Sequence, residues 1–330
     1  MSGRIYMAGM CMAGRGEAST TNPNAMITAN LFYPWMLESY HYIGPKWAAL
    51  QGLRERKETI FLDSGAFSMF TLGVEVDLAA YAKFVKENAD IIHVSSNIDA
   101  IGSGNEQKSY DNLAFLEQEG AHVQPVHHAR DRDEWLERYI SEGYDYIFLG
   151  GMVPESTTYL LGWLDHIWSK YLINPDGTAK VKIHGFGITN EVIMFRYPWF
   201  SVDSTAWNAR ARYGMVMLDL PGLREIDLHF SDQSAQQYKD NSWHFNRLRG
   251  LDRKRVLDRL EELEAERRCA PDYNPEVELW LKDKTGIEQG YNPEALATMT
   301  GWRSHFNIQY FARCEKRMVD RFIPEQGGLW

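Results

Sequence analysis

The chain has few cysteines and no long apolar run. Only three of its 330 residues are cysteine (Cys11, Cys269 and Cys314), and no two of them form a Cys-x-x-Cys pair. This number argues against a disulfide framework and fits a reducing cytoplasm, while the spacing provides no ordinary zinc knuckle. No apolar run approaches the roughly 18–20 residues that cross a bilayer, and residues 1–7 lack the apolar core of a secretory signal. We therefore expect a cytoplasmic protein without a membrane segment.

Basic residues are also in the minority. The chain has 35 Lys and Arg against 45 Asp and Glu, a net charge of −10. This balance argues against sequence-blind adhesion to nucleic acid, which depends on neutralising phosphates, but it leaves room for a local basic groove. Aromatic residues are plentiful, with 11 Trp and 17 Tyr. They can serve as core packing or as stacking platforms for bases.

Short apolar segments alternate with helix-like segments through residues 1–232. The expected strands cover residues 4–10, 58–62, 91–95, 122–126, 144–149, 181–186 and 200–202, and residues 215–218 or 226–230 could complete the set. The expected helices cover residues 25–42, 76–88, 110–119, 131–141, 156–172 and 189–195. This alternation predicts an α/β fold, a TIM-like (β/α)8 barrel. A doubly wound sheet is the alternative, disfavoured because no Gly-x-Gly-x-x-Gly follows the first strand.

The character of the sequence changes after residue 232. Helical patterns are expected over residues 252–268, 276–281, 293–299 and 302–322. In the first of these, Val256, Leu260 and Leu263 recur on one face. We predict a barrel over residues 1–232 and a helical C-terminal extension over residues 233–330.

Two aspartates stand where predicted strands end. Asp63 follows the largely apolar segment 59–62, and Asp203 follows the largely apolar segment 199–202. Parallel barrels carry their chemistry at the carboxyl ends of the strands. Paired carboxylates suit substitution at an anomeric carbon, because one can attack C1′ while the other handles the leaving group's proton. We predict that Asp203 and Asp63 face one pocket as nucleophile and general acid/base; capping or turn roles are the alternative.

Five segments, in order along the chain, resemble motifs of the tRNA-guanine transglycosylase superfamily. Asp63-Ser64-Gly65-Ala66-Phe67 resembles its Asp-Ser-Gly-Gly-Phe signature, Ser96-Asn97-Ile98-Asp99 its guanine-reading segment, Leu149-Gly150-Gly151-Met152 its Gly-Gly-Leu loop, Ile183-His184-Gly185-Phe186-Gly187 its Met-Gly-Val-Gly turn, and Val202-Asp203-Ser204 with Arg210 and Arg212 its nucleophile segment. The resemblance spans residues 58–215. It implies a (β/α)8 barrel that exchanges guanine for a 7-deazaguanine base without cutting the strand.

The resemblance also implies roles for individual residues. Asp203 would be the nucleophile and Asp63 the general acid/base. The implied base-binding residues are Ser64, Phe67, Asp99, His127, Gly150, Gly151, Met152 and His184, with Phe67 and His184 stacking on opposite faces of the base. The implied nucleic-acid contacts are Arg210 and Arg212. Trp207 is a candidate for a different reason: moving a base out of duplex DNA calls for wedge or stacking residues. For His127 a structural imidazole is the alternative, and for Trp207 it is core packing.

The chain departs from the family pattern in the zinc site. The family binds zinc after the barrel with three Cys and one His, whereas Cys269 and Cys314 are far apart here, so we expect no metal or other cofactor; a scattered Cys2His2 zinc site is the alternative. With its Leu62-Asp63-Ser64-Gly65-Ala66-Phe67 segment and without the zinc pattern, the chain resembles the short phage enzymes that install 7-deazaguanines in DNA. This implies DNA as the polymer, a free preQ0-like base as the second substrate and the host bacterial cytoplasm as the location. The alternatives are tRNA as the polymer, a hydrolytic N-glycosidase and a non-catalytic nucleic-acid-binding barrel.

Overall fold

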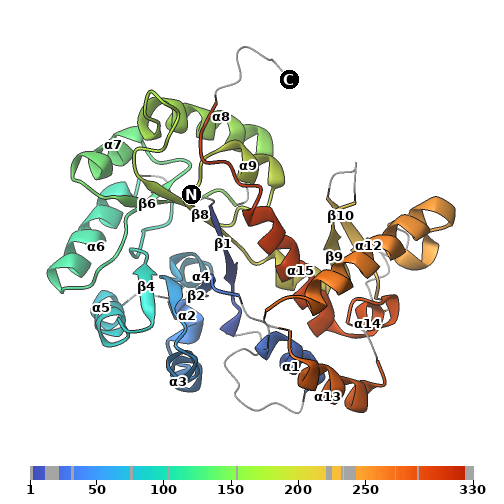
Figure 1. Cartoon of the computed structure of the whole chain (residues 1–330). Coiled ribbons are helices and arrows are strands. Elements are labelled where there is room, and N and C mark those ends of the chain that lie inside the picture. The colour runs from blue at the N-terminus through green and yellow to red at the C-terminus, as the bar shows by residue number, and fades with distance from the viewer. Residues whose placement is uncertain are drawn as a thin grey trace. The chain divides into compact units, whose positions relative to one another are not determined.

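A computed structural model describes residues 3–11, 22–30, 33–74, 77–102, 104–153, 155–220, 225–231, 233, 243–271, 273–287 and 290–323. These residues form two compact units (Figure 1). The first unit comprises Met1–Gly9, Pro34–Ser204 and Cys314–Trp330, and the second comprises Met10–Tyr33 and Thr205–Arg313. The chain thus enters the second unit after Ser204, ahead of the boundary expected at residue 232.

The first unit is built on an eight-stranded parallel sheet that curls, consistent with a TIM-like barrel. Its strands are β1 (Arg4–Ala8), β2 (Met36–Ser39), β3 (Ile60–Asp63), β4 (Ile92–Ser95), β5 (Val126–His128), β6 (Tyr146–Gly150), β7 (Lys182–Gly185) and β8 (Ser201–Ser204). Their order is β4-β3-β2-β1-β8-β7-β6-β5. Just beyond the outermost strands, Ser96 forms an isolated parallel bridge with Gln124. The Gln124 N–H donates to the Ser95 carbonyl at 2.8 Å.

Helices connect the strands of this unit. They are α2 (Tyr40–Ile43), α3 (Trp47–Arg56), α4 (Ala66–Leu72), α5 (Leu78–Glu87), α6 (Glu106–Gln118), α7 (Asp133–Ser141), α8 (Thr157–Ile167), which a π-helical turn at Trp168–Leu172 continues, and α9 (Glu191–Arg196). In Figure 1, α5, α6, α7 and α8 follow one another along the outside of the sheet. α5 shows why these segments are helical: the Asp77 side chain caps its first turn by accepting the Ala80 N–H at 2.9 Å. Its buried Tyr81 and Val85 then face inward at helical spacing.

The helix expected over residues 25–42 is wrong. Helix α1 ends at Ala29, and residues 36–39 form β2, paired with β1 and β3. Met36, Leu37 and Glu38 are all buried, so this strand lacks the polar–apolar alternation that distinguishes a strand from a helix. β2 completes the set of eight strands. Residues 215–218 and 226–230 therefore have no place in this sheet.

The second unit contains an antiparallel strand pair and several helices. They are α1 (Pro23–Ala29), α10 (Ala206–Arg212), β9 (Met215–Leu218), β10 (Ile226–His229), a 3-10 turn at Phe245–Arg247, α12 (Gly250–Arg268), α13 (Pro275–Thr285), α14 (Pro293–Thr298) and α15 (Thr300–Glu315). The expected face of α12, formed by Val256, Leu260 and Leu263, is buried in the core of this unit, which confirms that prediction. Across the described parts of both units, no helix has the length and apolar character that a membrane crossing requires.

Aromatic side chains fill the interior of the curled sheet. Tyr6, Phe61, Tyr146 and Phe148 belong to one buried cluster contributed by β1, β3 and β6. Ring centroids lie 5.3 Å apart for Tyr6 and Phe61 and 4.9 Å apart for Phe61 and Phe148. Such close-packed rings restrict movement of the layer above them. That layer, at the carboxyl ends of the strands, is polar.

Candidate active site

Three carboxylates gather at the carboxyl ends of the sheet strands. Asp63 is the last residue of β3, Asp203 lies in β8, and Asp99 follows β4. Burial, then the charge of Asp99, then that of Asp203 raise the pKa of Asp63 from 3.8 to about 7. A carboxyl group beside two other acids keeps its proton to higher pH, because losing it would add another negative charge close to theirs. Asp63 therefore lies close enough to Asp99 and Asp203 for both charges to act on it.

A tight turn fixes Asp63. The Gly65 N–H donates to its Oδ2 at 3.0 Å. Gly65 has φ +77°, and a Cβ there would lie 2.7 Å from the Ser39 hydroxyl, so glycine is required. The Ser64 N–H donates to the Ser96 hydroxyl at 2.7 Å, and the Ser64 side chain is fully buried. Ser64 therefore shapes the turn, and its buried side chain does not support the predicted base contact.

Asp99 is paired with His128, a histidine that was not among the predicted site residues. His128 Nε2 lies 2.7 Å from Asp99 Oδ2. On the other side, Asp131 accepts the backbone N–H of His128 at 2.8 Å. Burial favours the neutral imidazole, but the hydrogen bond and charge of Asp99 outweigh it, so the pKa of His128 is raised. One oxygen of Asp99 is thus held in place by the His128 ring.

His127 does not lie in the site, contrary to the prediction. Its imidazole is fully buried, stacked on Trp163 with ring centroids 6.3 Å apart. Burial lowers its pKa to about 4, so it is a neutral core residue. Successive side chains of a strand point to opposite faces, which is why His128 reaches the site and His127 does not. The adjacent histidines were visible in the sequence, but the strand was expected at residues 122–126 and lies at Val126–His128.

The end of β6 and the loop that follows it pack against His128. A Cβ on Gly150 would lie 2.7 Å from the His128 Cδ2, so only glycine permits this approach. The Gly150 carbonyl accepts the Ala129 N–H at 3.1 Å. Beyond it, Gly151 is exposed and the Met152 side chain is buried. The predicted contact of this loop with a base thus concerns its backbone.

Asp203 has two polar neighbours, a backbone N–H and a buried histidine. Its Oδ1 accepts the Gly187 N–H at 2.8 Å and lies 3.4 Å from His184 Nε2. His184 is fully buried and packs on Phe61, with ring centroids 4.6 Å apart. The prediction that His184 stacks on a base is therefore wrong, because no face of its ring is accessible. Phe67, by contrast, is 63% exposed on α4 and is available for stacking.

The three predicted nucleic-acid contacts belong to the second unit. Trp207 is 1% exposed and is a core residue there, so it cannot contact nucleic acid in this conformation. The Arg210 guanidinium lies 2.5 Å from an Asp227 carboxylate oxygen. Arg212 is exposed. Of the three, only Arg212 has an exposed side chain, while the charge of Arg210 is paired with Asp227.

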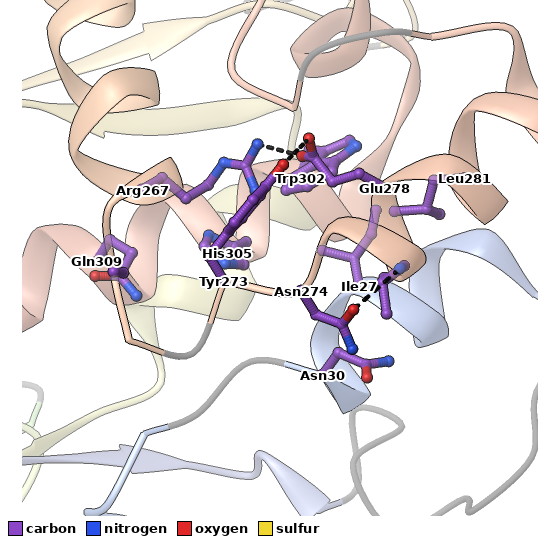
Figure 2. Close-up of a pocket in the computed structure, with 12 residues that line it drawn as sticks. Ile27, Asn30, Arg267, Tyr273, Asn274, Glu278, Leu281, Trp302, His305 and Gln309 are labelled. Carbon is purple, nitrogen blue, oxygen red and sulfur yellow. Dashed lines mark hydrogen bonds and ion pairs between the residues drawn. The ribbon is translucent and has the colours of Figure 1, made fainter.

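The second unit also contains a small pocket (Figure 2). It is lined by Ile27, Asn30, Arg267, Ala270, Tyr273, Asn274, Val277, Glu278, Leu281, Trp302, His305 and Gln309. The charge of Arg267 is already paired with Glu264 and Glu278, and its guanidinium lies 4.8 Å from the centre of the Trp302 ring. The pocket volume of about 50 Å3 suits a few water molecules and is far below the roughly 300 Å3 of small ligand sites. We do not assign it a ligand.

Within the described ranges, no three His, Cys, Asp or Glu side chains are arranged to hold a metal ion. The scattered zinc site considered from the sequence therefore has no ligand set there. No model of a known protein family matches the chain, and no curated protein matches it either.

Proposed function

We propose that this protein exchanges guanine in DNA for a 7-deazaguanine base through a covalent bond between Asp203 and deoxyribose. The observation that supports this most directly is the position of Asp63 beside the charges of Asp99 and Asp203 at the ends of the strands, with the pKa of Asp63 raised to about 7. In the proposal the first unit is a (β/α)8 barrel that presents these acids at the carboxyl ends of its strands. No redox step is involved.

In the first step the Asp203 carboxylate attacks C1′ and the bond from C1′ to guanine N9 breaks. The bonding electrons leave with guanine, and the Asp63 carboxyl gives up its proton to the departing base. A group with a pKa of about 7 is about half protonated at neutral pH, so it can serve as both acid and base. The products of this step are free guanine, an Asp203–deoxyribose ester and ionised Asp63.

In the second step a 7-deazaguanine occupies the position that guanine left. Ionised Asp63 takes the N9 proton of the incoming base as N9 bonds to C1′. The ester bond breaks, and Asp203 leaves as a carboxylate. The proton lost by Asp63 in the first step is restored in the second, so the exchange has no net proton change.

Recognition of the base falls to the remaining residues of the site. Asp99 would accept the N1–H and N2–H donors of guanine, which adenine does not offer. His128 holds one Asp99 oxygen at 2.7 Å and so fixes the direction of the carboxylate. Exposed Phe67 would stack on the base plane, with the backbone of Gly150, Gly151 and Met152 along its edge. Arg210 and Arg212 are the proposed phosphate contacts.

The proposal is tested by base exchange. The protein is incubated with radiolabelled guanine and either duplex DNA or tRNA, and each polymer is then separated under denaturing conditions. We expect DNA to retain label with the wild type and not with Asp203→Asn. The control is Asp283→Asn, which neutralises a side chain that is 75% exposed on α13. It should exchange like the wild type.

The same assay distinguishes the alternative functions. Label in tRNA alone would assign the activity to RNA. Release of guanine from DNA with no uptake of label would indicate a hydrolytic N-glycosidase. DNA binding without release or uptake, equal in wild type and Asp203→Asn, would indicate a non-catalytic binding protein.

A further inference from the structure

We infer that a buried hydrogen-bond chain from Tyr146 through Ser201 to His184 orients Asp203 so that its Oδ2 is the attacking atom. The statement that Oδ2 attacks C1′ rests on the proposed function. The orientation itself depends on geometry alone. In this assignment His184 is a positioning residue, replacing the stacking role that the sequence suggested for it.

The chain links three neighbouring strands inside the sheet. The Tyr146 hydroxyl, on β6, lies 2.6 Å from the Ser201 hydroxyl on β8. Ser201 Oγ lies 2.6 Å from His184 Nδ1, on β7, and His184 Nε2 lies 3.4 Å from Asp203 Oδ1. Ser201 and Asp203 are two residues apart on β8 and so share a face, while Ser201 lies opposite His184 in the strand register.

The donors of this chain can point in only one direction. An ionised carboxylate only accepts, so the proton of a neutral His184 must be on Nε2, and Nδ1 must be an acceptor. Ser201 therefore donates to Nδ1, and Tyr146 donates to Ser201. Burial lowers the pKa of His184 and raises that of Tyr146, so both side chains are neutral and the order is fixed.

The two oxygens of the Asp203 carboxylate therefore have different surroundings. Oδ1 of Asp203 accepts the Gly187 N–H at 2.8 Å and faces His184 Nε2 at 3.4 Å, whereas within the described chain no donor reaches Oδ2. Hydrogen bonds withdraw electron density from the oxygen that accepts them, so Oδ2 is the better nucleophile. At 3.4 Å, and within the described residues, His184 Nε2 has no hydrogen-bond partner, so it acts on Oδ1 through its charge distribution and not through a hydrogen bond.

The direction of the chain can be measured without any activity. In protein labelled with nitrogen-15 histidine, NMR chemical shifts report which ring nitrogen carries the proton. We expect His184 as the Nε2–H tautomer at neutral pH, and a mixture of tautomers in Ser201→Ala, where Nδ1 has lost its donor. A Nδ1–H tautomer or an imidazolium in the wild type would overturn the inference.

Kinetics test whether this orientation matters. Ser201→Ala should slow covalent adduct formation at saturating DNA by about 3- to 10-fold, the loss expected for one neutral hydrogen bond, with DNA affinity unchanged. Tyr146→Phe should slow it less, and should add nothing in the Ser201→Ala background, because the two changes break one chain. Additive losses would overturn the inference.

The matched control is Tyr6→Phe. It removes a phenol oxygen from the same buried cluster, but that oxygen bonds His93 Nε2 at 2.9 Å and lies outside the chain. Wild-type rates are expected; a loss equal to that of Tyr146→Phe would mean general damage to packing and overturn the inference. If wild-type protein shows the Nε2–H tautomer but forms no adduct, the proposed function fails while the orientation of Asp203 stands.

Discussion

Replacing Asp63 with the neutral Asn should increase the free energy of unfolding at neutral and alkaline pH but not at acid pH. The raised pKa means that the folded protein holds this proton more tightly than the unfolded chain does: about 7 against 3.8. Between these values the unfolded chain has lost the proton and the folded protein has kept it. The free energy of unfolding therefore falls as pH rises through this window, and the loss is complete above pH 7. At about 1.4 kcal/mol per pH unit, the full cost is on the order of 4 kcal/mol.

Urea denaturation at pH 5 and pH 8 measures most of this cost. For these two pKa values, linkage gives a fall of about 2–3 kcal/mol between the two conditions. Asp63→Asn removes the charge and keeps an oxygen able to accept the Gly65 N–H. The variant should therefore gain about 2–3 kcal/mol relative to wild type on going from pH 5 to pH 8. Asp283→Asn, at an exposed position, should gain nothing.

The refuting result is a difference between Asp63→Asn and wild type that does not change with pH. It would mean that Asp63 is ionised in the folded protein at pH 5. The acid role assigned to Asp63 would then lose its physical basis, although Asp203 could still act as a nucleophile.

Four further outcomes are expected. The rate of base exchange should fall on the alkaline side with an apparent pKa of about 7, as Asp63 loses the proton that the leaving base needs; a flat profile from pH 6 to 9 would count against it. Gly150→Ala should destabilise by about 1–3 kcal/mol and slow exchange, since its Cβ would lie 2.7 Å from the His128 ring, whereas Gly162→Ala, with open space around it, should not; thermal melts of both decide. Phe67→Ala should raise the KM for the free base by about 10-fold and change stability by less than about 0.5 kcal/mol, because the ring is exposed; an unchanged KM argues against stacking. Asp203→Asn should reduce exchange by on the order of 1000-fold or more without loss of DNA binding, as gel-shift and exchange assays together would show.

The strand-end acids could be predicted because the signal is local. An apolar run that stops at an aspartate places that carboxylate at the edge of a sheet wherever the strand lies, and this held for both Asp63 and Asp203. The pairing of Asp99 with His128 was not local. It depends on how the ends of β4 and β5 meet, and they are joined by the Ser96–Gln124 bridge.

The direction of side chains was harder to predict than the strands themselves. His127 was selected by its resemblance to a base-contacting position of the family, and a motif resemblance does not say which of two adjacent histidines faces the site; β5 includes both, and only His128 does. β2 was missed for a different reason: its buried residues do not alternate with polar ones. Without β2, residues 215–218 and 226–230 seemed needed for the sheet, and they form a separate pair instead.

The division into two units also depends on distant parts of the chain. The second unit combines residues 10–33 with residues 205–313, and α1 belongs to it although its sequence lies between two sheet strands. The change in composition near residue 232 marks no boundary of this kind. Local patterns identified α12 and its buried face, but not the unit in which α1 packs.

Intact-mass analysis tests the central claim most directly. The protein is incubated with a guanine-containing DNA oligonucleotide in the absence of any incoming base, denatured and weighed. The account predicts a species heavier by the oligonucleotide less one guanine in the wild type, and none in Asp203→Asn. A wild-type protein that releases guanine while its own mass never changes would contradict a covalent Asp203 intermediate.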